Sequence, residues 1–134
     1  MADHRCISER YAKIGAELVG TEDAFAHIRS SEATIVYLSS QAEKVSRGRP
    51  VLGQCERVPD RFKWAVPCDF TITVFEPNVA GMTDEQIRIL LLHELMHVGV
   101  ETNKDGEEVY RTVPHDLEDF RAIVEAFGID WADH

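Results

Sequence analysis

The segment RILLLHELMHVGV, residues 88 to 100, constrains the fold of this chain more than any other stretch. It is strongly apolar, which predicts burial, yet it carries His93, Glu94 and His97 at its centre. Polar side chains that lose water need partners, because burying one unpaired costs roughly 2 to 7 kcal/mol. The fold therefore has to supply a partner for this H-E-x-x-H motif.

The motif lies in a segment with strong helix signals. TDEQ, residues 83 to 86, is a capping box, and Gly99 is well placed to end a helix that begins at Thr83. On such a helix the apolar residues form two flanks, which predicts a central and buried element. One flank contains Ile87, Leu91, Leu95 and Val98, and the other contains Ile89, Leu92 and Met96.

Helical spacing brings the polar residues of the motif together. At ~100° per residue, His93 and His97 lie about 40° apart and one turn from each other, so both imidazoles can reach one ion. Glu94 lies beside His97, where it can reach a water molecule on that ion. Zinc suits this set, because imidazole binds it well and a catalytic zinc site combines three protein ligands with one water. We predict that Glu94 acts as the general base.

The third zinc ligand has to come from another part of the chain. Position 103 is Asn103, so the metzincin pattern, with its histidine six residues after the second, is absent. The next histidine is His115, at the start of a second predicted helix that begins at residue 115 or 116 and ends at Phe127. We predict His115 as the third ligand, with Glu118 on the same helix as the alternative.

The other segments predict an α+β fold in a single domain that covers residues 1–134. Composition excludes some functions. Twenty-four acidic against fourteen basic side chains give a net charge of -10, which disfavours direct nucleic-acid binding. No membrane span and no signal peptide are expected, so we predict a cytoplasmic protein with three reduced cysteines.

Helices are expected at about 8–19 and 21–29, a helical turn within 59–67, and strands at 33–40, 51–58 and 69–75.

The chain resembles the putative phage metallopeptidases. The resemblance rests on CDFTITVFEP, MTDEQIRILLLHELMHVGV, an acidic DGE loop and HDLEDF, and it extends from about residue 33 to the C-terminus. Members commonly read H-E-L-C-H-C-G, whereas this chain has Met96 and Val98 in place of the two cysteines. More distantly, the chain is similar to SprT-like zinc proteases. The resemblance implies a compact zincin, with a small twisted sheet on the metal helix and an edge strand near the cleft. Residues 69–75 are our candidate for that strand, to which an extended peptide can add.

These observations predict a zinc-dependent peptidase with a peptide or protein substrate. Tyr110 and Arg111, in a predicted loop before His115, are candidate donors to the oxyanion that forms at the scissile carbonyl. One alternative is a non-catalytic, zinc-stabilised phage or prophage interaction protein, which a glutamate placed as a base disfavours. Another is a regulatory interaction module in which the motif is incidental, and metal content distinguishes it. No feature of the sequence indicates a specificity pocket or an oligomeric state.

Overall fold

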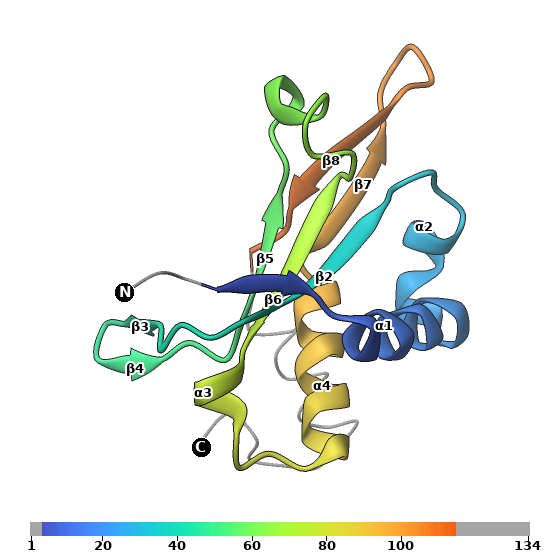
Figure 1. The fold of residues 1–134 in the computed structure, drawn as a ribbon. Helices are drawn as coiled ribbons and strands as arrows, with labels where there is room; N and C mark the ends of the chain where they lie inside the picture. The colour runs from blue at the N-terminus through green and yellow to red at the C-terminus, as the bar shows by residue number, and fades with distance from the viewer. Residues whose placement is uncertain (1–3, 115–134) are drawn as a thin grey trace.

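The computed structural model describes residues 4–114, which form an α+β domain of the predicted class (Figure 1). A four-stranded sheet has helices packed against one face, and two small two-stranded sheets complete the fold. The predicted C-terminal helix, from residue 115 or 116 to Phe127, lies outside the described residues, as do His115 and Glu118. Within residues 4–114 no helix has the length and apolar character needed to cross a membrane.

The strands of the main sheet have the order β1-β2-β6-β5. Strand β2 is parallel to β6, while β1 and β5 are antiparallel to their neighbours. Strand β6 therefore has partners on both sides, and the prediction that residues 69–75 form the edge strand is wrong. The physical reason is that the backbone of β6 pairs with β2 on one side and with β5 on the other, so it has no free edge, and its side chains are mostly buried. The four strands are Arg5–Ile7 (β1), Ile35–Ser40 (β2), Gly53–Arg57 (β5) and Phe70–Phe75 (β6).

Helix α1, Glu9–Thr21, packs across the sheet close to β2. Ser8 caps its N-terminus, because the Ser8 side chain accepts a hydrogen bond from the amide of Tyr11. Gly15 permits the close approach, because a Cβ atom there would lie 2.2 Å from the ring of Tyr37. The predicted second helix is a 3-10 turn, Asp23–Phe25 (η1), followed by a short helix, Ala26–Arg29 (α2).

Helix α4, Asp84–Leu95, is the predicted central helix. Its capping box is present, and its apolar residues are buried on both flanks. It ends at Leu95, however, and not at Gly99, so His97 lies just beyond the last helical residue. The amide of His97 donates to the carbonyl of Glu94 at 3.0 Å in a tight final turn. Strand β7, Val98–Thr102, then begins at once because it pairs with β8, Glu108–Thr112.

The remaining elements are short connections. The predicted helical turn within residues 59–67 is the 3-10 helix η2, Asp60–Phe62, in the loop between β5 and β6. A hairpin of two short strands, Val45–Ser46 (β3) and Arg49–Pro50 (β4), precedes β5. Its turn needs positive φ at Arg47 and Gly48. Helix α3, Glu76–Val79, leads from β6 toward α4 (Figure 1).

Candidate functional site

A cavity of about 440 Å³ lies where the C-terminal end of α4 meets the start of β5 and the end of β8. All three residues of the predicted motif line this cavity. The opposite wall could not be found from the sequence, because the start of a strand and the end of a hairpin carry no local signal of a site. The lining residues are Gly53, Gln54, Cys55, His93, Glu94, His97, Thr112, Val113 and Pro114.

The two histidines of the motif are neighbours on the cavity wall. The ring centroids of His93 and His97 are 5.6 Å apart, with an interplanar angle of 61°. Both side chains are half-buried. The turn that follows Leu95 thus keeps the two imidazoles close, although only His93 belongs to the helix. The chain presents two imidazole donors to one space, as a metal site requires.

The backbone of Val113 fixes the orientation of His97. The Nδ1 atom of His97 lies 2.6 Å from the carbonyl oxygen of Val113, and the Val113 amide donates to the His97 carbonyl at 2.7 Å. A carbonyl oxygen can only accept, so this hydrogen bond places the proton on Nδ1. In the neutral ring Nε2 is then the deprotonated nitrogen, which is the form that binds a metal. This arrangement is typical of histidine ligands.

Glu94 is the most buried polar residue of the cavity wall, with 6% of its surface exposed. Burial raises the pKa of its carboxyl group to about 8, because the charged form loses hydration. Gly53 makes room for this side chain, since a Cβ atom there would lie 3.3 Å from the Glu94 Cγ atom. A cation in the cavity would lower the pKa of Glu94 again by favouring the carboxylate.

Cys55 lines the cavity near Glu94 as a protonated thiol. Burial raises the pKa of Cys55 to about 12, and the carboxylates of Glu94 and Glu56 add to the shift. All three cysteines of the chain are free thiols, as predicted; Cys6 is exposed and Cys68 is buried. The high pKa argues against Cys55 as a nucleophile at neutral pH.

Tyr110 and Arg111, the two candidate donors to the oxyanion, do not line the cavity. Both lie on strand β8, where the sequence predicted a loop. The Tyr110 hydroxyl donates to Glu108 at 2.6 Å, and the Arg111 guanidinium donates to Glu101 at 2.9 Å. Both hydrogen bonds thus connect residues within the β7–β8 hairpin, and the half-buried Tyr110 ring packs against the core. We therefore assign neither residue a role in the cavity.

The predicted third ligand, His115, lies outside the described residues, directly after the cavity-lining Pro114. Among residues 4–114, no group of three or more His, Cys, Asp or Glu side chains is arranged to hold a metal ion. Within that range the structure brings His93, Glu94 and His97 together. The identity of the third ligand remains a prediction.

Fold and cavity together define the class: a small α+β domain in which an H-E-x-x-H motif lines a cavity at the end of a buried helix. A family model described as "Putative phage metallopeptidase" matches residues 4–134, and the chain belongs to this family. No curated protein and no solved structure matches the chain. The family name implies a metal-dependent peptidase. The more distant similarity to SprT-like proteases rests on the sequence resemblance alone.

Proposed function

We propose that the protein is a zinc-dependent peptidase in which His93, His97 and His115 hold the metal and Glu94 is the general base. The observation that carries this proposal is the convergence of His93, Glu94 and His97 on one cavity wall. The Val113 hydrogen bond supports His97 as a ligand through Nε2. The position of Pro114 on the same cavity supports its neighbour in sequence, His115, as the third ligand.

The chemistry divides between the metal and Glu94. Zinc, when bound, supplies Lewis acidity at the scissile carbonyl and lowers the pKa of water. The Glu94 carboxylate accepts a proton from the attacking water and then gives it to the leaving amine. A cation in the cavity would lower the raised pKa of Glu94 and so favour the carboxylate, which is the form that can accept the proton.

Strand β5 supplies a place for an extended substrate. The Val58 amide donates to the Asp69 carbonyl, and the Phe75 amide donates to the Leu52 carbonyl. The even-numbered residues of this segment therefore form their backbone hydrogen bonds with β6. The backbone groups of Gly53, Cys55 and Arg57 alternate with these and face away from β6. In the part of the chain that the structure describes, β5 is an edge strand. An extended peptide can add there through backbone hydrogen bonds and pass the cavity. This strand replaces residues 69–75 in that role.

The substitution Glu94→Gln tests the proposal. The zinc-loaded variant should retain its metal and its fold, while peptide hydrolysis falls about 10²- to 10⁴-fold because an amide cannot accept the proton. Glu85→Gln is the matched control, since Glu85 is an exposed acid at the other end of the same helix. Hydrolysis at the parental rate by Glu94→Gln would refute Glu94 as the base. Zinc binding without cleavage of any peptide by the parent would favour the non-catalytic interaction protein.

A further inference from the structure

Three apolar side chains are exposed on the loop that connects β5 to β6. Trp64 has 87% of its surface exposed, Phe62 has 46% and Val66 has 39%. We call these three residues the apolar loop. Grouped exposure of large apolar side chains is a common mark of a binding surface, and tryptophan is the residue most enriched at binding hot spots.

The backbone of the apolar loop is ordered by its own hydrogen bonds. The amide of Phe62 donates to Pro59 at 2.9 Å, and the amides of Ala65 and Val66 donate to the Phe62 carbonyl at 3.0 and 2.8 Å. These bonds form consecutive tight turns. The apolar side chains are thus presented from a fixed backbone, which lowers the entropic cost of binding a ligand.

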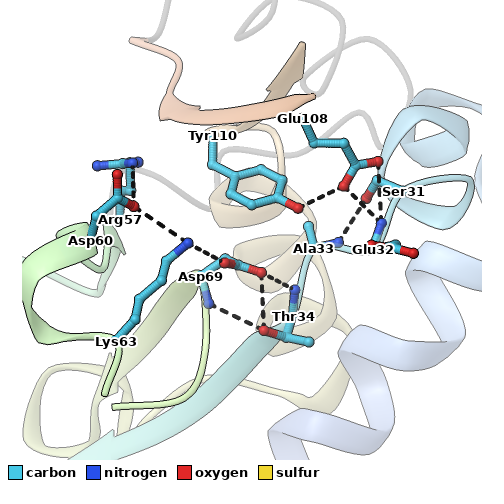
Figure 2. Close-up of polar contacts among 10 residues, drawn as sticks. All are labelled: Ser31, Glu32, Ala33, Thr34, Arg57, Asp60, Lys63, Asp69, Glu108 and Tyr110. Carbon is cyan, nitrogen blue, oxygen red and sulfur yellow. Dashed lines mark hydrogen bonds and ion pairs between the residues drawn. The ribbon is translucent and has the colours of Figure 1, made fainter. Parts of the chain in front are cut away.

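Lys63 attaches the apolar loop to the rest of the domain. Its ammonium group lies 2.8 Å from Asp69 and 3.4 Å from Asp60, and 5.1 Å from the centre of the Tyr110 ring (Figure 2). Asp69 in turn accepts a hydrogen bond from the Thr34 amide at 2.8 Å. Lys63 thus connects the loop to Tyr110 on β8 and, through Asp69, to Thr34 just before β2, so it fixes the loop relative to the sheet.

Strand β5 connects the cavity to the apolar loop without interruption. Cys55 lines the cavity, and η2 begins five residues later at Asp60. At ~3.3 Å per residue, about five residues of extended peptide would cover this distance. A peptide that adds antiparallel to β5 runs from the apolar loop toward the cavity. The residues that meet the loop are therefore on the N-terminal side of the scissile bond.

We propose that the apolar loop is a substrate subsite. It binds a large apolar side chain of an extended peptide about four to six residues N-terminal to the scissile bond, a span that follows from the ~3.3 Å rise per residue. The inference rests on the proposed peptidase function, because the cavity sets the position of the scissile bond. The occupant is a peptide segment because, among residues 4–114, no strand pairs with the outer edge of β5, and this edge leads from the loop into the cavity.

A randomised library of synthetic peptides, cleaved by the zinc-loaded full chain and mapped by mass spectrometry, tests the subsite. Parent cleavage should be enriched in Phe, Leu, Ile or Trp at the stated positions, and Trp64→Ala should lose this enrichment. For one preferred peptide, KM should rise about 5- to 30-fold in Trp64→Ala, as expected for a hot-spot residue, with little change in kcat. Ile7→Ala is the matched control, since Ile7 is 71% exposed at the opposite edge of the same sheet.

The outcomes separate the subsite from the peptidase function. Cleavage without the enrichment, or with the same enrichment in Trp64→Ala, would overturn the subsite and leave the peptidase intact. If nothing is cleaved, the subsite is tested by measuring which library peptides are retained on the immobilised chain. Retention of apolar peptides that Trp64→Ala loses would support the subsite while the peptidase fails, and equal retention would overturn it. Self-association that Trp64→Ala abolishes, with no peptide preference, would assign the loop to a second copy of the chain and overturn the proposal.

Discussion

Replacing Glu94 by glutamine in the metal-free protein should change how stability depends on pH. Burial raises the pKa of Glu94 from 4.5 to about 8 in the folded protein. The folded state therefore holds this proton more tightly than the unfolded chain. The contribution of this bound proton to the free energy of unfolding is complete below pH 4.5 and is lost as the pH rises through about 8.

The expected size of this effect follows from linkage. Within that interval each pH unit corresponds to about 1.4 kcal/mol. Raising the pH by two units, from about 5.5 to about 7.5, should therefore lower the unfolding free energy of the metal-free parent by about 2 to 3 kcal/mol relative to Glu94→Gln. All other groups of the chain are the same in both proteins, so their direct contributions cancel in the comparison.

Urea unfolding, followed by circular dichroism with a chelator present, measures this difference at several pH values. Zinc should reduce the difference, because a cation next to the carboxyl group favours its charged form. Parallel pH curves for the metal-free parent and Glu94→Gln would refute the reasoning. They would mean that the Glu94 carboxylate carries no desolvation cost in the folded protein, and that no cation is needed to offset it.

Three further predictions concern the metal and the cavity. In zinc titrations against a competing chelator, His115→Ala should weaken zinc binding by orders of magnitude. Glu118→Ala should weaken it by about 10- to 100-fold at most. The opposite order would identify Glu118 as the ligand. Elemental analysis should find one zinc per chain, held more weakly as the pH falls because imidazoles must lose their protons to bind; well under half an equivalent would contradict the zinc site. Gly53→Ala should keep zinc but lower kcat several-fold, because the added Cβ atom would lie 3.3 Å from the Glu94 Cγ atom and shift this side chain slightly; a parental kcat in a peptide assay would contradict this.

Local sequence determined the parts of this protein that depend on neighbours along the chain. The capping box at Thr83 and the apolar residues on both flanks predicted the start and the burial of α4. The spacing within the H-E-x-x-H motif predicted that His93, Glu94 and His97 would lie together. The capping and burial of α4 follow from helical geometry, and His97 stays close to His93 because the chain makes a tight turn after Leu95, in which the His97 amide donates to the Glu94 carbonyl.

Only the tertiary structure decided the features that join residues far apart in sequence. Helix α4 ends at Leu95 because the next residues pair with β8, and strand pairing is not encoded at the point where the helix stops. The wall of the cavity opposite the motif comes from β5, where Gly53 lies against Glu94. Likewise, β5 and not β6 lies at the edge of the sheet next to the cavity, because strand order depends on which distant segments pair with one another. Such contacts arise from packing the whole domain, and a pattern within one segment does not contain them.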